Sequence, residues 1–236
     1  MNYCEVKIMH DAHFHFSKEI VQLQKEHSIQ GICNVANLSE YALVKEQGLF
    51  YSCGVHPWQA NQTLFDQMLP IMEKASIIGE IGMDSVWCDV NLNVQKEIFI
   101  KQIQFAYEKK KPVILHTKGQ EKEILDVIKK YPNTYIVHWY GCMDYLSQYN
   151  QVASYFTIGP SIQKEEAVRQ VVQNIFIEKL LLETDGLDAV KWAVGHTDYV
   201  RALEVELQQV AKIKGIPQDL IEKVLDDNFH RLLQNG

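Results

Sequence analysis

Short apolar runs alternate with longer amphipathic segments along the whole chain. Several of these runs are almost wholly apolar over four to six residues, which is typical of parallel strands covered on both faces. We therefore expect eight strands. They are predicted at Val6–His15, Ile29–Val35, Leu49–Val55, Ser76–Met83, Pro112–Thr117, Thr134–Trp139, Ser154–Gly159 and Leu180–Thr184.

The segments between the strands have the spacing of amphipathic helices. The clearest is Val94–Lys110, in which isoleucine, phenylalanine and alanine recur among Lys, Gln and Glu side chains. Further helices are predicted at Glu121–Lys130, Asp198–Lys214 and Gln218–Leu233. The last two are separated by Gly215 and Pro217, which are typical stop and start signals of helices.

This alternation predicts an α/β protein with eight strand–helix units. A length of 236 residues suits one (β/α)8 TIM barrel. The chain contains no low-complexity segment, internal repeat or linker, so we expect residues 1–236 to form a single domain. A doubly wound open sheet is the alternative, because it shares the same alternation of strands and helices.

Histidines and acids lie within or at the ends of five predicted strands. His13 and His15 are two residues apart at the end of the first, so both imidazoles face one side. The other candidates are Glu80, His116, His138 and Asp185. A barrel keeps its active site at the carboxyl ends of its strands, and such groups are costly to bury unless paired or coordinated. Their convergence predicts a divalent metal site.

Composition and charge narrow the classes of partner. The formal net charge is −7, with 23 basic and 30 acidic side chains. The densest basic run, Lys109 to Lys111, is explained as the expected end of a helix, and the sequence has no basic stripe. Broad electrostatic binding of nucleic acid is therefore disfavoured.

The five cysteines are widely spaced without a Cys-x-x-Cys motif, which argues against a disulfide framework. The sequence has no signal-peptide pattern and no membrane-spanning run. We therefore expect a cytoplasmic protein that does not associate with a membrane and has no obligate protein partner.

A set of ordered motifs resembles the TatD family of metal-dependent hydrolases, which are amidohydrolase-type barrels. The resemblance spans the chain from the first strand to the last helix. The motifs are Asp11-Ala12-His13-Phe14-His15, Gly54-Val55-His56-Pro57, Gly79-Glu80-Ile81-Gly82-Met83-Asp84, the strand ends at His116 and His138, Leu182-Glu183-Thr184-Asp185, and Asn228–Leu233. It implies a TIM barrel that holds two divalent cations.

The resemblance also implies a division of the ligands. His13, His15 and Asp185 would hold one ion, His116 and His138 the second, and Glu80 would bridge or complete the pair. Mixed imidazole and carboxylate donors suit Zn²⁺ or Mn²⁺, whereas Mg²⁺ prefers more oxygen ligands.

One ligand and two neighbouring residues have expected roles in the reaction. Asp185 would ligate and also act as the general base that takes a proton from water. His56 lies near the same mouth, where substrate contact and a structural loop role are both open. Lys118 is the expected substrate-binding cation, in place of an arginine that many relatives have there.

Several features of the pocket leave the substrate open. Trp58, Trp139 and Tyr140 are candidates to shape it, although packing is the alternative for each. Asp11 would orient a ligand or satisfy backbone groups, and His10, His27, His196 and His230 have no partner in the pattern.

Three functions therefore remain. The leading one is hydrolysis of a phosphodiester, in the manner of a deoxyribonuclease. The alternatives are hydrolysis of a small carboxylic ester, amide or phosphoester, and a non-catalytic barrel that binds metal.

Overall fold

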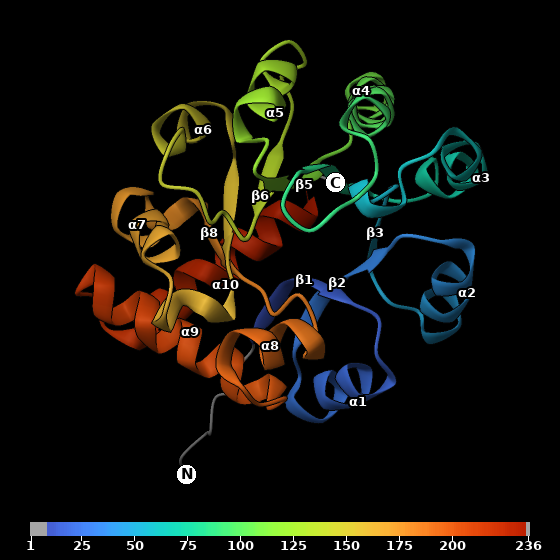
Figure 1. Cartoon of the computed structure of the whole chain (residues 1–236). Coiled ribbons are helices and arrows are strands. Elements are labelled where there is room, and N and C mark those ends of the chain that lie inside the picture. The colour runs from blue at the N-terminus through green and yellow to red at the C-terminus, as the bar shows by residue number, and fades with distance from the viewer. Residues whose placement is uncertain (1–8, 235–236) are drawn as a thin grey trace.

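Eight parallel strands form the centre of the molecule, with helices between them around the outside (Figure 1). The computed structural model describes residues 9–234. The strands are β1 (His10–His15), β2 (Gln30–Val35), β3 (Tyr51–Cys53), β4 (Ile77–Asp84), β5 (Val113–Lys118), β6 (Tyr135–His138), β7 (Tyr155–Ile158) and β8 (Leu180–Leu182). Each of the eight predicted strands is therefore present, although Val6 to Ile8 of the first lie outside the described residues.

The helices confirm the alternation that the sequence predicts. They are α1 (Lys18–His27), α2 (Leu38–Gln47), α3 (Gln62–Met72), α4 (Leu92–Lys109), α5 (Glu121–Ile128), α6 (Leu146–Val152), α7 (Glu166–Asn174), α8 (Leu187–Val194), α9 (Tyr199–Lys214) and α10 (Gln218–Gln234). Short 3-10 turns lie at Pro57–Gln59, Pro160–Gln163 and Ile177–Lys179. Asp198 begins the predicted helix as its N-cap, where its carboxylate accepts from the backbone NH of Arg201 at 3.1 Å.

The strand order shows a nearly closed barrel and excludes the open doubly wound sheet. The strands pair in chain order from β1 to β8. Between β8 and β1, the backbone NH of Asp185 donates to the carbonyl of His13 at 3.0 Å. The Asp11 carboxylate accepts from the backbone NH of Thr184 at 3.0 Å and from its hydroxyl at 2.6 Å. A parallel barrel of this kind is the (β/α)8 TIM barrel that the sequence predicts.

The core explains why the strands are so apolar. All eight residues of β4 are buried, because helices cover the outside of the strands and other strands face them inside. At the end of the barrel opposite the mouth, Ile32, Ile77 and Ile114 pack with Phe229 of α10. Helix α10 therefore closes that end of the barrel, and the polar strand ends remain at the other.

The structure describes four of the five cysteines. Cys33, Cys53, Cys88 and Cys142 are free thiols, whereas Cys4 lies outside the described residues. Within residues 9–234, no helix has the length and apolar composition needed to cross a membrane.

Candidate metal centre

Strand β1 carries two of the predicted ligands, His13 and His15. The pairing of β1 with β2 shifts register between Asp11 and Phe14, so β1 has one extra residue there. Such bulges re-aim side chains, and this one lies next to His13. His13 is fully buried, whereas the His15 side chain is 44% exposed at the mouth. The sequence pattern placed both histidines at the end of the first strand, but it did not indicate the bulge.

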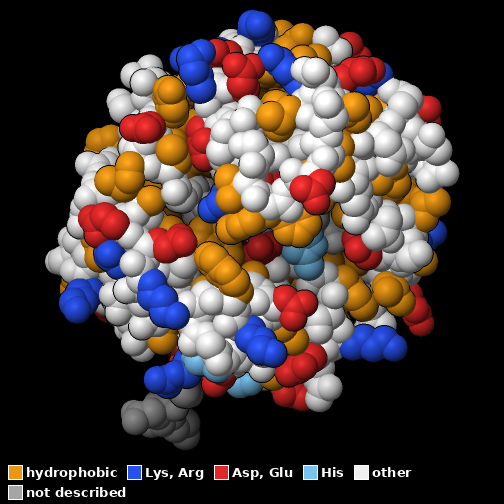
Figure 2. All heavy atoms as spheres, in the orientation of Figure 1, with side chains coloured by type: hydrophobic (Ala, Val, Ile, Leu, Met, Phe, Trp, Pro, Cys, Tyr) orange, Lys and Arg blue, Asp and Glu red, His pale blue; other side chains and the backbone are white. Residues whose placement is uncertain are grey.

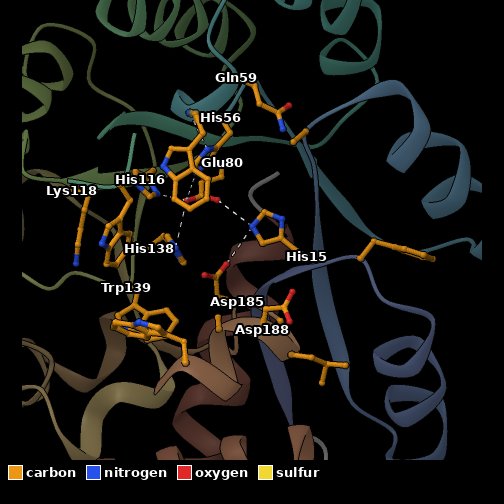
Figure 3. A pocket seen from close by; sticks show the side chains of 18 of the residues that line it. His15, His56, Gln59, Glu80, His116, Lys118, His138, Trp139, Asp185 and Asp188 are labelled. Atoms are coloured by element: carbon orange, nitrogen blue, oxygen red, sulfur yellow. Dashed lines mark hydrogen bonds and ion pairs between the residues drawn. The ribbon is translucent and has the colours of Figure 1, made fainter. Parts of the chain in front are cut away.

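Glu80 of β4 lies between two groups of histidines (Figure 3). Its Oε2 is 3.3 Å from His13 Nε2 and 3.6 Å from His15 Nε2. Its Oε1 faces three other imidazoles. The nearest nitrogens are Nδ1 of His116 at 2.6 Å, Nε2 of His56 at 3.5 Å and Nε2 of His138 at 3.5 Å.

The backbone around Glu80 explains its central position. Strand β4 also shifts register against β5, between Ile78 and Ile81, so Glu80 lies within a second bulge. Its backbone NH donates to Asn34 Oδ1 at 2.7 Å, which anchors the irregular segment to β2.

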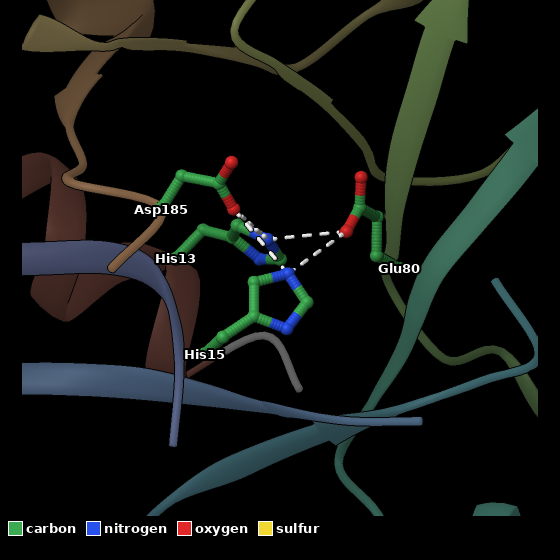
Figure 4. Close-up of side chains that lie close together, drawn as sticks. All are labelled: His13, His15, Glu80 and Asp185. Atoms are coloured by element: carbon green, nitrogen blue, oxygen red, sulfur yellow. Dashed lines mark ion pairs between the residues drawn. The ribbon is translucent and has the colours of Figure 1, made fainter. Parts of the chain in front are cut away.

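Asp185 completes the first group from the loop after β8 (Figure 4). Its Oδ1 is 3.4 Å from His13 Nε2 and 3.3 Å from His15 Nε2, on the side of the rings opposite Glu80. The backbone of Asp185 has φ of 59°, a left-handed conformation that aspartate tolerates better than most residues. Strand β8 ends at Leu182, so Asp185 lies three residues beyond it rather than directly at its end.

His116 at β5 has a carboxylate partner that the sequence did not assign. Its Nε2 is 3.1 Å from Oδ2 of buried Asp84, while its Nδ1 faces Glu80. Asp84 is itself fixed, because Trp58 Nε1 donates to it at 2.7 Å and the backbone NH of Trp87 donates at 2.9 Å. Asp84 was visible in the motif after Glu80, but its distance from His116 along the chain concealed the contact.

His138 at the end of β6 has a similar partner. Glu183 is fully buried, and its Oε2 lies 2.8 Å from His138 Nδ1. This contact puts a proton on Nδ1 and leaves Nε2, the nitrogen that faces Glu80, free to donate a lone pair. Glu183 belongs to the motif Leu182-Glu183-Thr184-Asp185, but the spacing of that motif does not show which way a strand-end carboxylate points.

His56 carries its ring proton on the other nitrogen from His138. Its Nδ1 accepts from the backbone NH of Trp58 at 3.2 Å, so the neutral ring carries its proton on Nε2. That Nε2 faces Glu80 and the cavity. Burial, opposed by Glu80, lowers the pKa of His56. This ring is therefore arranged as a hydrogen-bond donor at the mouth.

The acidic groups and the histidines of the centre shift one another's pKa values. Burial alone would lower the pKa values of His13 and His15, but Asp185 and Glu80 outweigh it and raise that of His13 well above its usual range and that of His15 to about 10. The same balance, with Glu80 and Asp84, raises the pKa of His116 to about 9. Burial opposes ionisation of Glu80 and Asp185, yet the neighbouring histidines hold the pKa of both carboxyls well below their usual range.

The donor set fits divalent cations. His13, His15, Glu80 and Asp185 offer ligand atoms within 4.8 Å of one another, and so do His56, Glu80 and His116. Nε2 of His13 and Oδ1 of Asp185 are buried without a hydrogen-bond partner among the described residues. Buried polar atoms that converge without hydrogen bonds are costly unless something else satisfies them, and a cation would do so.

The cavity above these groups has a volume of about 730 Å³. It is hollowed into the centre of the face shown in Figure 2, where hydrophobic side chains surround acidic and histidine side chains. Trp58, Trp87, Trp139 and Trp192 all line it, and they are the four tryptophans of the chain. Lys118 lies at its edge, with Nζ 4.3 Å from the Trp87 ring centroid.

Other candidates near the mouth have packing roles. Tyr140 is buried against Tyr149 and Phe156 and does not line the cavity, in contrast to the substrate-shaping alternative for it. Asp11 satisfies backbone groups, since it accepts from the NH of His13 at 3.3 Å as well as from Thr184. It therefore orders the strand ends that carry His13 and Asp185 without contacting their side chains.

Comparisons with known proteins agree with this architecture. The model of the TatD-related DNase family matches residues 10–234. MJ1582 of Methanocaldococcus jannaschii, an uncharacterized metal-dependent hydrolase, is 24% identical over 238 residues that cover 92% of this chain and 94% of the relative. The Homo sapiens 3'-5' RNA nuclease TATDN2 is 26% identical over 209 residues, 80% of this chain but 27% of that protein.

A solved structure extends the similarity to the fold. YjjV of Escherichia coli, a TatD homolog, has a TM-score of 0.82 at 21% identity, over 96% of this chain and 98% of that one. The family match covers nearly all of the described barrel and includes every residue of the candidate centre. The chain belongs to the TatD family of metal-dependent hydrolases.

Proposed function

We propose that the chain hydrolyses phosphodiesters with two divalent ions held at the mouth of the barrel. His13, His15 and Asp185 would hold one ion, His116 and His138 the other, and Glu80 would bridge them. The observation that carries the proposal is the position of Glu80, whose two oxygens face two separate groups of imidazoles. One carboxylate between two donor groups suits two neighbouring ions better than one.

The contacts of the imidazoles support the choice of ligands for the second ion. His138 has its Nδ1 against Glu183, and His116 has one ring nitrogen against Asp84. A carboxylate on the far side of an imidazole is the usual support for a metal ligand. His56 instead presents an N–H to the cavity. It is therefore better suited to donate to a substrate oxygen than to ligate an ion.

The chemistry of the site favours hydrolysis. When bound, two divalent ions polarise an ester and lower the pKa of bound water to about 7. As metal ligands, His13 and His15 would be neutral. The Asp185 carboxylate, which is 23% exposed at the cavity, would then accept a proton from water there. Zn²⁺ and Mn²⁺ fit the imidazole-rich donor set better than Mg²⁺ does.

Two features support a nucleic-acid phosphodiester as the substrate class. The matching family model is that of TatD-related DNases, and one relative is named as an RNA nuclease. The cavity also combines a lysine with four tryptophans, which suits a phosphate joined to flat bases, since bases stack on aromatic side chains. The net charge of −7 disfavours tight binding of long duplex, so we favour short or single-stranded ends.

A panel of substrates tests this proposal. The purified protein, stripped of metal and resupplied with Mn²⁺ or Zn²⁺, would be incubated with oligonucleotides, phosphomonoesters, carboxylic esters and amides. We expect metal-dependent cleavage of phosphodiesters to exceed that of the other classes. Preferential turnover of carboxylic esters or amides would instead support the alternative of a small-molecule hydrolase. Metal binding without turnover of any class would favour a non-catalytic barrel.

A further inference from the structure

A second cluster of metal-ligating side chains lies at the end of the barrel opposite the mouth. His10 is the first residue of β1, whereas His15 at the mouth is the last. Asp226 and His230 are four residues apart on α10, so they lie one above the other on one face of that helix. The cluster therefore joins the first described strand to the last helix. Although the sequence pattern gave His10 and His230 no partner, the fold brings them together.

The distances within the cluster are short. Nε2 of His10 is 3.0 Å from Oδ1 of Asp226. Nδ1 of His230 donates to the backbone carbonyl of Asp226 at 3.0 Å and is 3.4 Å from its Oδ1, so Nε2 is the nitrogen of His230 with a free lone pair. The rings of His10 and His230 are 5.3 Å apart between centroids and nearly perpendicular, at 82°. The three residues offer ligand atoms that all lie within 4.8 Å of one another.

The closest pair of atoms does not form a hydrogen bond. His10 Nε2 and Asp226 Oδ1 are both buried, and neither has a hydrogen-bond partner among the described residues, although they are 3.0 Å apart. The angles at these two atoms are therefore unsuitable for a hydrogen bond, although the distance is short. A buried nitrogen and oxygen left without hydrogen bonds cost free energy, and a cation between them would remove that cost.

The packing around the cluster holds it in place. The His10 ring stacks on Phe229 at 4.2 Å between centroids, and Phe229 packs into the closed end of the barrel. Asp226 and His230 keep exposed side-chain fractions of 31% and 44%, so an ion can reach the site from solvent. Glu222, one turn before Asp226, borders a small hollow together with His10.

We propose that His10, Asp226 and His230 bind a divalent cation of the zinc class, separate from the ions at the mouth. Two imidazoles and one carboxylate suit Zn²⁺, whereas Mg²⁺ and Ca²⁺ prefer oxygen ligands. The ion ties β1 to α10, which closes this end of the barrel. Its role is structural, because none of the residues proposed for the active site lies at this end.

Zinc counting on matched variants tests the site. The native protein, Asp226→Asn, His230→Gln and the control His27→Gln, which removes an exposed histidine of α1, would be saturated with ZnCl₂, freed of excess and measured for zinc per chain. We expect Asp226→Asn and His230→Gln each to bind one equivalent fewer than the native protein, and His27→Gln to bind the same amount. Equal zinc content in all four proteins would overturn the proposal.

Thermal unfolding supplies an independent readout. Added ZnCl₂ should raise the melting temperature more for the native protein and His27→Gln than for His230→Gln, because an ion that binds only the folded state stabilises it. His15→Ala removes a ligand at the mouth. Adding His230→Gln to this variant should still reduce the rise in melting temperature that ZnCl₂ causes. Failure of the mouth site and failure of this site are therefore distinguishable. An identical zinc response with and without His230→Gln would contradict the proposal.

Discussion

Asp185 and Glu183 lie two residues apart on the chain, but they contact different parts of the centre. Asp185 faces the cavity and both histidines of β1, whereas Glu183 is fully buried behind His138. One carboxylate can therefore take part in the reaction, and the other can act only through the imidazole that it orients. This difference leads to two separable predictions.

Asp185→Asn should separate the reaction from metal binding. The amide keeps the size of the side chain and one oxygen ligand, but it loses the basicity needed to accept a proton. We expect kcat to fall by roughly 10²–10⁴-fold, the range for a positioned acid or base. The metal content should change little, since the other proposed ligands remain. Near-native turnover with unchanged metal content would show that Asp185 is not the base and would leave His56 as the next candidate.

Glu183→Gln should instead weaken metal binding. The amide cannot stabilise the imidazole as a carboxylate does, so we expect the affinity for the ion at His138 to fall by roughly 10–100-fold. Activity should return at high concentrations of Mn²⁺ or Zn²⁺, as measured by titration. Glu178→Gln, at an exposed position in a neighbouring 3-10 turn, is the matched control. Equal affinities in the two variants would mean that Glu183 serves only to pack the strand end.

At the scale of elements, the sequence predicted the strands well and their irregularities poorly. Apolar runs indicated all eight strands, because burial on both faces leaves a strong signature. The bulges beside His13 and Glu80 have no such signature, since they depend on pairing with β2 and β5. The carboxylates Asp84 and Glu183 were missed for the same reason: their contacts with His116 and His138 exist only once the strands are side by side.

Helix α9 contains a carboxyl group that the apolar pattern does not explain. Glu206 is fully buried, and both of its side-chain oxygens lack a hydrogen-bond partner among the described residues. Burial, reinforced by Asp11 and Glu183, raises the pKa of Glu206 well above 4.5. The folded state therefore retains a proton that the unfolded state releases, and stability is lost as pH rises above the unfolded pKa.

Glu206→Gln should remove this pH dependence. The variant should gain stability relative to the native protein as pH rises from 5 to 8, by up to about 1.4 kcal/mol per pH unit until the folded pKa is passed. Urea unfolding at several pH values measures the difference. Glu108→Gln, at an exposed position of α4, should show no such trend. Parallel stability curves for the native protein and Glu206→Gln would contradict the assignment of a buried, protonated carboxyl.

At the scale of the whole molecule, the four tryptophans come from separate parts of the chain and meet at one cavity. Trp192 of α8 joins the group, with ring centroids 5.8 Å from Trp87 and 6.1 Å from Trp139. The sequence indicated Trp58 and Trp139 only as candidates, because the contribution of α8 depends on how the barrel closes. The shape of the pocket is therefore a property of the fold rather than of a motif.

Trp192→Leu should weaken the binding of substrates that carry bases. Loss of a stacking surface should raise KM for an oligonucleotide on the order of 10-fold, with a smaller effect on kcat. KM for an alkyl phosphodiester should change little, because it has no ring to stack. Phe176→Leu replaces an aromatic side chain that is 72% exposed outside the cavity and is the matched control. Equal changes in KM for the two substrates would argue against base stacking.

The central feature of the proposed centre is that Glu80 lies between two ions. Anomalous diffraction from crystals soaked in MnCl₂ measures this without knowledge of the substrate. We predict two peaks about 3.5–4 Å apart, the usual separation in two-metal sites, on either side of the Glu80 carboxylate. One peak should lie among His13, His15 and Asp185, and the other beside His116 and His138. Manganese peaks absent from the mouth, or a single site that does not involve Glu80, would contradict the two-ion centre.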